Sequence, residues 1–325
     1  MTNWIEANAL INQAQSILVV THVKPDGDAI GSLLGLTNAL RENGKQVTAA
    51  VDGGVPDFLQ NLPSAETVIN DLNAGQWDVM VSVDASDEER TGKAGDFGRQ
   101  HSKFVINLDH HPTNTLFGNV QIVVPGAVSA TEIVFDWLIS LGFQISQPVA
   151  TALLTGLVTD TIGFRTSNVV PRTLAVAHEL MIAGASLVDI IHTTLVSKPY
   201  SHIELWKQVF PSVNFDEGVA SAVVLPDNLE KAGLTDMTDG GLVSTLVAAN
   251  EVVIAVVFKV EGPTRVEISF RSKVGYDVGQ VAFSLGGGGH RQASGVTLQS
   301  PLDDVKAQVM PLLKAIARQG RVVSG

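Results

Sequence analysis

The stretch Thr21-His22-Val23-Lys24-Pro25-Asp26-Gly27-Asp28-Ala29-Ile30-Gly31-Ser32 stands between an apolar, strand-like run at 17–20 and a helical pattern over 29–43. Pro25 restricts the backbone of the loop and Gly27 permits a tight bend, so we expect Asp26 and Asp28 to flank a turn just past a strand. An imidazole and two carboxylates at the end of a strand are typical ligands of divalent metal ions.

Two more polar groups follow strand-like runs. Asp84 comes after the run 79–83, and Asp109-His110-His111 comes after the run 104–108. Ligands of an open parallel sheet bind outside the carboxyl ends of its strands, so we expect these segments to converge on one cleft. Alone, Asp26-Gly27-Asp28 would be ordinary turn residues and Asp84 a helix cap or loop end, whereas a histidine pair after a strand is rarer. Together, in this order, they favour a metal centre.

The residue types also indicate what such a centre does. Asp26 and Asp28 could face two different ions, with Asp84 bridging them. Two ions ~3.5–4 Å apart can activate a water and stabilise the attacking and leaving oxygens of a phosphoryl group. Carboxylates with an imidazole suit Mn²⁺ or Mg²⁺ better than a soft metal, and zinc stays open. The pattern predicts a two-metal phosphoesterase.

The order of apolar runs predicts two domains. Strand-like runs at 17–20, 46–51, 77–83 and 103–108 alternate with helical patterns at 29–43, 129–141, 148–158 and 171–183. This alternation predicts an α/β domain whose parallel sheet has helices on both faces. Past residue 195 we expect a helix at 202–210, strands at 219–224, 252–260 and 264–271, and a helix at 302–318. We therefore predict a catalytic domain over 1–190, a linker helix over 191–212 and a smaller α/β domain over 213–325.

The composition narrows the class of protein. The 325 residues include no Cys, which excludes disulfides and thiolate metal sites. The N-terminus shows no signal-peptide pattern, and runs such as 252–258 are far short of the ~20 residues of a membrane span. We therefore expect a cytoplasmic protein with no membrane partner. The net charge of −12, without a Lys/Arg cluster, argues against long duplex nucleic acid and favours a small phosphorylated substrate.

Four segments resemble the motifs of the DHH phosphoesterase superfamily, in the expected order: 22–32, 83–87, 108–112 and Thr159-Asp160-Thr161. Ser269-Phe270-Arg271-Ser272 and Gly286-Gly287-Gly288-Gly289-His290 resemble the C-terminal DHH-associated domain of the nano-RNase branch. That branch includes bifunctional oligoribonucleases and 3′,5′-bisphosphate nucleotide (pAp) phosphatases, and relatives that cleave linear or cyclic dinucleotides. The resemblance covers nearly the whole chain.

The resemblance implies a role for each matched residue. One ion would be held by His22, Asp26 and Asp84, and the other by Asp28, Asp84, His110 and Asp160. His111 would contact the scissile phosphate or its leaving group, and Asp109 would orient the neighbouring imidazoles. The hydroxide shared by the ions would be the nucleophile. Mn²⁺ is the expected metal, with Mg²⁺ and Co²⁺ as alternatives. Asp160 enters through the resemblance alone, whereas Asp87 is expected to brace a loop.

The resemblance also implies a substrate clamp and an active site between the two domains. The clamp would consist of Arg271, Ser272, Gly288, Gly289 and His290, with Arg165 adding a contact from the first domain. From spacing alone, the glycine run favours a flexible loop and Arg271 a surface ion pair. Ile162 and Gly279 depart from the family pattern, which puts the substrate preference in question more than the chemistry.

The favoured hypothesis is a Mn²⁺-dependent hydrolase of short oligonucleotides, such as nanoRNA and pApA, and of pAp. The nearest alternative is a cyclic di-AMP phosphodiesterase on the same scaffold. An inorganic pyrophosphatase or exopolyphosphatase is disfavoured by the motifs of the C-terminal domain. A regulatory module with a decayed site would need a missing ligand, and every matched ligand is present. The resemblance suggests a homodimer.

Overall fold

The computed structural model describes residues 4–320, and the chain divides into two compact units, Met1–Ser197 and Lys198–Gly325. They are called the N-terminal unit and the C-terminal unit below. The ends of the predicted domains, Met1–Asn3 and the last five residues, lie outside the described residues. Each unit has its own sheet and its own apolar core.

The described part of the N-terminal unit contains a five-stranded sheet in which every neighbouring pair is parallel. Its order is β2-β1-β3-β4-β5. The strands are β1 (Ser16–Val20), β2 (Gln46–Ala50), β3 (Trp77–Val83), β4 (Ser102–Asp109) and β5 (Val120–Val123). The chain therefore leaves β1 toward one edge and returns to build the other side, which makes a switch point between β1 and β3.

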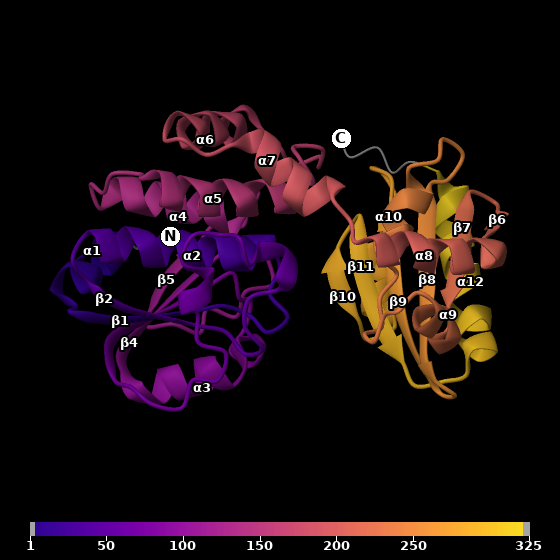
Figure 1. Cartoon of the computed structure of the whole chain (residues 1–325), viewed down its shortest axis with the longest axis horizontal. Helices are drawn as coiled ribbons and strands as arrows, with labels where there is room; N and C mark the ends of the chain where they lie inside the picture. The colour runs from indigo at the N-terminus through magenta and orange to yellow at the C-terminus, as the bar shows by residue number, and fades with distance from the viewer. Residues whose placement is uncertain (1–3, 321–325) are drawn as a thin grey trace. The chain divides into compact units, whose positions relative to one another are not determined.

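Helices cover both faces of this sheet, as the alternating pattern predicts (Figure 1). The helices are α1 (Trp4–Gln13), α2 (Gly27–Glu42), α3 (Gly92–His101), α4 (Ala130–Ser140), α5 (Gln147–Asp160), α6 (Pro171–Ile182) and α7 (Leu187–Ile191). α1, α2 and α4 lie on one face and α3 lies on the other. α5 packs against α2 and α4, with α6 outside it. Ser129 caps α4, because its hydroxyl accepts from the Glu132 N–H.

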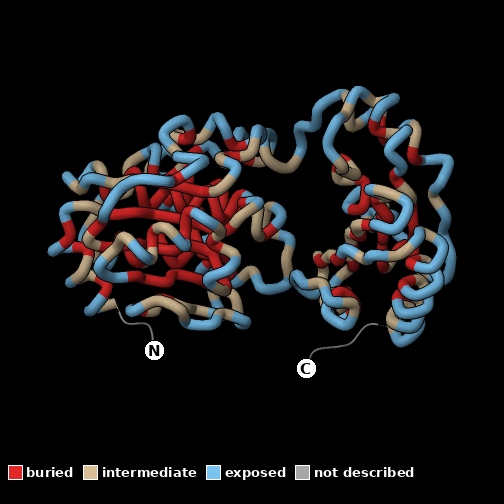
Figure 2. Tube along the Cα trace, turned by 90° about the horizontal axis from the view of Figure 1, so that it is seen from below, coloured by how far each residue is buried: buried red, intermediate tan, exposed pale blue. Residues whose placement is uncertain are grey.

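The core of the N-terminal unit lies between the sheet and the α2, α4 and α5 layer. β1 and β3 are almost wholly buried and β4 is buried from Val105 onward, which explains their continuous apolar runs. Figure 2 shows the buried segments gathered in the interior of this unit. Trp137 of α4 is fully buried there and donates its indole N–H to Asn8.

The C-terminal unit has a mixed sheet of order β10-β11-β9-β8-β7-β6 in its described part. Only β7 and β8 pair in parallel among these strands. The elements are α8 (Tyr200–Val209), β6 (Asn214–Asp216), β7 (Val219–Val224), α9 (Pro226–Lys231), α10 (Leu242–Val247), β8 (Ile254–Gly262), β9 (Arg265–Ser272), α11 (Val278–Ser284), β10 (Gly288–His290), β11 (Ala293–Leu298) and α12 (Leu302–Gln319). Apolar clusters lie on both faces of the sheet.

The sequence misses some elements for identifiable reasons. α3 carries Gly92, Gly95 and Gly98, which lower its helix propensity. A Cβ at Gly98 would lie 2.5 Å from Leu18 Cδ2, so close packing against the sheet requires glycine there. The expectation of a flexible glycine loop is wrong for Gly288–His290, because these residues form a strand that pairs with β11.

No single helix among residues 4–320 is long and apolar enough to cross a membrane. α6 and the segment Leu187–Ser212, which are bent by 113° relative to each other, pass that test only as a pair and only by length and composition.

Candidate metal centre

The fold brings the polar ends of three neighbouring strands together. β1, β3 and β4 are adjacent and parallel, so their carboxyl ends meet at one edge of the sheet. His22 follows β1, Asp84 follows β3, and Asp109 is the last residue of β4. This edge includes the switch point between β1 and β3, where a doubly wound sheet opens a crevice for ligands.

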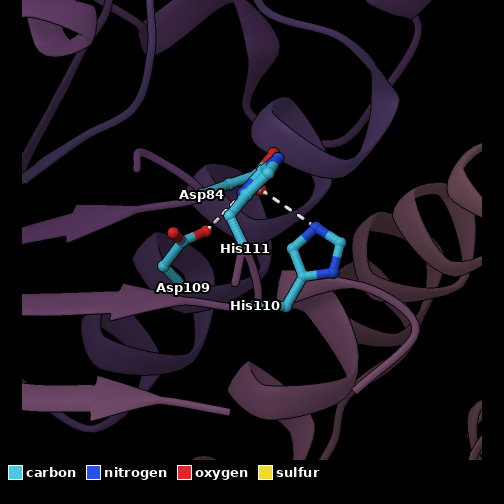
Figure 3. Close-up of side chains that lie close together, drawn as sticks. All are labelled: Asp84, Asp109, His110 and His111. Carbon is cyan, nitrogen blue, oxygen red and sulfur yellow. Dashed lines mark hydrogen bonds and ion pairs between the residues drawn. The ribbon is translucent and has the colours of Figure 1, made fainter. Parts of the chain in front are cut away.

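The predicted ligands form three overlapping groups in the described part of the chain. In each group, one ligand atom from every member lies within 4.8 Å of the others. The groups are His22, Asp26 and Asp84; Asp28, His110 and Asp160; and Asp84, Asp109, His110 and His111. The first group is the set that the resemblance implies for one ion. The second is the set implied for the other ion without the bridging Asp84. Figure 3 shows the third group at the ends of the strands.

Asp84 lies at the centre of these groups. Its Oδ2 is 3.6 Å from His22 Nε2, and its Oδ1 is 3.6 Å from His110 Nε2 and 3.7 Å from His111 Nδ1. The residue is buried, with a left-handed φ of 55°, a conformation that costs about 1–3 kcal/mol at a non-glycine residue. Oδ1 has no hydrogen-bond partner among the described residues. A buried carboxylate oxygen of this kind is stable only with a cation or a proton.

Backbone carbonyls orient two of the imidazoles. His22 Nδ1 lies 2.9 Å from Val23 O, and His110 Nδ1 lies 3.4 Å from Ala127 O. A carbonyl only accepts, so Nδ1 carries the proton and Nε2 presents its lone pair to the carboxylates. Burial lowers the pKa of His22, and it lowers the pKa of His110 to about 4. Both rings are therefore neutral, as metal ligands must be.

Asp109 and His111 form a separate pair. Asp109 Oδ1 accepts from His111 Nδ1 at 2.7 Å, and Asp109 Oδ2 accepts from Asn114 Nδ2 at 2.6 Å. Burial raises the pKa of Asp109, but the hydrogen bonds from His111 and Asn114 and the charges of His111 and His110 together lower it overall. Asp109 thus remains an anion that fixes the His111 ring. Nothing in the sequence analysis pointed to Asn114.

Asp26 and Asp28 hold the loop as well as facing the site. Asp26 is the N-cap of α2, and its Oδ1 accepts from the backbone N–H groups of Asp28 and Ala29 at 3.0 Å each. Asp28 accepts from Ala130 N at 2.6 Å and Thr131 N at 3.0 Å, at the start of α4. Burial, followed by the charge of Asp26, raises the pKa of Asp28 to about 6 despite these bonds.

Glycines allow α2 to approach α5 closely, which brings Asp28 near Asp160. Gly27 and Gly31 lie four residues apart and so share one face of α2. A Cβ at Gly31 would lie 2.6 Å from Ala152 O, and one at Gly27 would lie 2.3 Å from Thr159 Oγ1. The expected bend at Gly27 is therefore wrong, because Gly27 begins α2 and close packing explains the glycine.

The electrostatics of the cluster favour a bound cation. Burial raises the pKa of Asp84 and of Asp160 well above the ordinary value, and neighbouring carboxylates raise both further. Carboxylates that repel one another beside neutral imidazoles form a donor set for a hard or borderline divalent ion. The residues present therefore fit the metal centre that the sequence predicts.

The other predicted site residues do not join these metal-binding groups. Arg165 is exposed, and its Nε donates to Ile162 O at 2.8 Å. In the C-terminal unit, Ser272 Oγ donates to Tyr276 O at 2.6 Å. Gly288 and Gly289 are exposed on the strand β10.

Arg271 and His290 share one face of the C-terminal sheet. Arg271 pairs in register with Ala293 of β11, and Ala293 pairs with His290 of β10. Directly paired residues point to the same face. Two strand spacings separate Arg271 from His290, about 10 Å. Arg271 is half-buried, and its Nη1 donates to Phe270 O at 2.9 Å.

Comparisons with known proteins agree with this geometry. The model of the DHH family, N-terminal domain, matches residues 16–157, and that of the DHHA1 domain matches residues 218–319. The bifunctional oligoribonuclease and PAP phosphatase NrnA of Thermus thermophilus is 35% identical over 92% of this chain and 89% of that protein. The protein of the same name from Bacillus subtilis is 30% identical over 89% and 91%. This chain belongs to the DHH family.

Two further likenesses bear on the fold and on the alternative function. A crystal structure of an exopolyphosphatase-related protein from Bacteroides fragilis has a TM-score of 0.88 at 24% identity, covering 97% of this chain and 96% of that one, and so shows the same fold. The cyclic-di-AMP phosphodiesterase GdpP of Geobacillus thermodenitrificans is 26% identical over 86% of this chain. This chain spans only 44% of that protein.

Proposed function

We propose that this protein is a metal-dependent phosphoesterase that hydrolyses short oligonucleotides and pAp. The observation that carries the proposal is the buried Asp84 carboxylate. Its Oδ1 has no hydrogen-bond partner among the described residues and lies 3.6 Å from His110 Nε2, and its Oδ2 lies 3.6 Å from His22 Nε2. The substrate class comes from the relatives, which are named as bifunctional oligoribonucleases and PAP phosphatases. The partial likeness to GdpP gives no reason to prefer a cyclic dinucleotide.

Two ions would share Asp84. His22 and Asp26 would complete the ligands of the first, and Asp28, His110 and Asp160 those of the second. When bound, such ions supply a water activated for attack and positive charge for the attacking and leaving oxygens. Mn²⁺ suits these oxygen and nitrogen ligands, with Mg²⁺ and Co²⁺ as alternatives.

His111 would act on the substrate directly. Its Nδ1 is held by Asp109, so its Nε2 would face a phosphoryl oxygen or the leaving oxygen. Asp109 fixes the ring in this orientation, and an Nε2–H would donate a hydrogen bond or a proton to that oxygen. Asn114 holds the second oxygen of Asp109 and keeps the pair in place.

The C-terminal unit would bind the rest of the substrate. Arg271 and His290 lie on one sheet face, and a half-buried guanidinium is suited to a second phosphate. The exposed backbone of Gly288 and Gly289 would add N–H donors. Ser272 would order the backbone after β9, and Arg165 would add a weaker contact. Replacing Arg271 with Gln should raise KM more than it lowers kcat.

A substrate panel tests the proposed function. Turnover of pApA, pAp, cyclic di-AMP and inorganic pyrophosphate is measured with Mn²⁺, Mg²⁺ and Co²⁺. We expect pApA and pAp to be hydrolysed fastest, with Mn²⁺ the best activator. Faster turnover of cyclic di-AMP would assign the alternative function, and absence of turnover with every substrate would overturn the proposal.

Asp84→Asn tests the chemistry itself. The amide keeps the shape of the side chain but removes the charge that both ions need, so activity should fall by at least about a thousandfold, the scale of removing an essential catalytic group. Asp136→Asn is the matched control, because Asp136 is exposed on α4 and pairs with Arg172. Full activity in Asp84→Asn would refute the two-metal centre.

A further inference from the structure

Arg90 lies in the loop after β3, and its backbone is tied to the loop that carries His22. The Arg90 N–H donates to Asp87 Oδ1 at 2.9 Å, and the Arg90 carbonyl accepts from Val23 N at 2.7 Å. Val23 directly follows His22 and accepts from its Nδ1. Both peptide groups of Arg90 are therefore fixed beside the first group of metal ligands. Asp87 braces this loop, as the sequence analysis expected.

The side chain of Arg90, in contrast, is not used by the fold. It is half-buried, and within residues 4–320 its guanidinium has no hydrogen-bond acceptor and no ion-pair partner. Two other arginines of the N-terminal unit differ: Arg99 donates to Thr91 Oγ1 and pairs with Asp96, and Arg41 donates to Val47 O. A half-buried guanidinium without an acceptor is costly unless water or a ligand satisfies it.

Arg90 lies beside the first group of metal ligands. Its carbonyl accepts from Val23 N at 2.7 Å, and Val23 directly follows His22, a member of that group. Because the Arg90 guanidinium has no acceptor among residues 4–320, it is available to bind an anion. The planar fork of a guanidinium matches two oxygens of a phosphate.

We propose that Arg90 is a substrate-binding residue that holds a non-bridging phosphoryl oxygen on the His22 side of the metal centre. Asp87 and Val23 then act as positioning residues, because they fix the backbone from which the guanidinium extends. The inference rests on the proposed function for the identity of the phosphate. It assigns to the N-terminal unit a cationic contact that complements the metal ions.

Steady-state kinetics of two variants test this inference. Arg90→Gln removes the charge and the fork, and Arg90→Lys keeps the charge alone. With pAp and Mn²⁺ we expect Arg90→Gln to raise KM by at least about tenfold, the loss expected for a hydrogen bond between charged groups, with kcat changed by less than about threefold. Arg90→Lys should fall between that variant and wild type. Arg172→Gln, which removes an exposed, ion-paired arginine of the same unit, should behave as wild type.

Two further measurements separate substrate binding from a structural role. The Mn²⁺-induced rise in Tm should be the same in Arg90→Gln as in wild type, and inorganic phosphate should inhibit the variant at least about tenfold more weakly. An unchanged KM and unchanged phosphate inhibition would overturn the inference, as would loss of the Mn²⁺ effect in both Arg90 variants. If wild type hydrolyses no substrate, the proposed function fails. Phosphate binding to the Mn²⁺-loaded proteins then still decides the role of Arg90.

Discussion

The arrangement of ligands around Asp84 makes a quantitative prediction about metal binding. The first group contains Asp26, the second contains Asp160, and Asp84 lies 3.6 Å from the nearest imidazole nitrogen of each. Asp26→Asn should remove one ion, Asp160→Asn should remove the other, and Asp84→Asn should remove both. Asn caps a helix about as well as Asp, so Asp26→Asn leaves the start of α2 intact.

The magnitude follows from ligand linkage. An ion present at 100 times its dissociation constant stabilises the folded state by about 2.7 kcal/mol per site, or about 5.4 kcal/mol for two sites. A unit of 197 residues gains about 2–4 °C in Tm for each kcal/mol. We therefore expect Mn²⁺ to raise the Tm of wild type by about 11–22 °C, of Asp26→Asn and Asp160→Asn by about half of that, and of Asp84→Asn by almost nothing.

Calorimetric titration of metal-free protein with Mn²⁺, paired with thermal unfolding, measures both quantities. The expected stoichiometries are two ions for wild type, one each for Asp26→Asn and Asp160→Asn, and none for Asp84→Asn. Asp136→Asn should match wild type, because it removes an exposed carboxylate of the same unit. Two ions bound by Asp84→Asn, or none bound by wild type, would refute the shared-ligand arrangement.

Three further predictions concern pH, helix packing and the histidine pair. Burial raises the pKa of Asp28 in the folded protein from 3.8 to about 6, so its protonation stabilises the folded state below pH ~4, and this contribution is lost as the pH rises through 6. Between pH 4 and 8, the unfolding free energy of metal-free wild type should therefore fall by about 3 kcal/mol relative to that of Asp28→Asn, as measured by urea unfolding. An equal pH dependence in the two proteins would contradict this. Gly31→Val should cost about 1–3 kcal/mol and weaken Mn²⁺ binding, because its side chain meets the backbone of α5, whereas Gly126→Ala enters open space and should change neither. Asp109→Asn should lower kcat by at least about a hundredfold while Mn²⁺ stoichiometry stays at two, because it disorders His111 but removes no predicted ligand; loss of an ion would instead make Asp109 a ligand.

The sequence was sufficient for the strands that carry the site and for the order of their polar ends. β3 has the predicted bounds, β1 and β4 begin one residue earlier than predicted, and β4 ends one residue later, at Asp109. Continuous apolar runs are clear signals for buried parallel strands. The acidic and imidazole residues after those runs then follow from the direction of a parallel sheet, because every such strand ends at the same edge.

Contacts between distant segments were beyond the reach of sequence reasoning. Asp28 is held by the first N–H groups of α4, more than a hundred residues away, and no local pattern announces that bond. Asp160 ends a helix that only close packing brings to the site. Arg90 and Asn114 carry no motif signal of their own, and their roles depend on loop geometry.

The double duty of Asp26 and Asp28 has an evolutionary consequence. One begins α2 and the other anchors α4, so both would be kept in a descendant that had given up hydrolysis. Among residues 4–320, the carboxylates of Asp84 and Asp160 make no such hydrogen bonds to helix N-termini. Burial and mutual repulsion of their charges destabilise the folded protein when no ions are bound. In lineages that lose activity, we expect Asp84 and Asp160 to be substituted first, and their substitution to increase the stability of the folded protein.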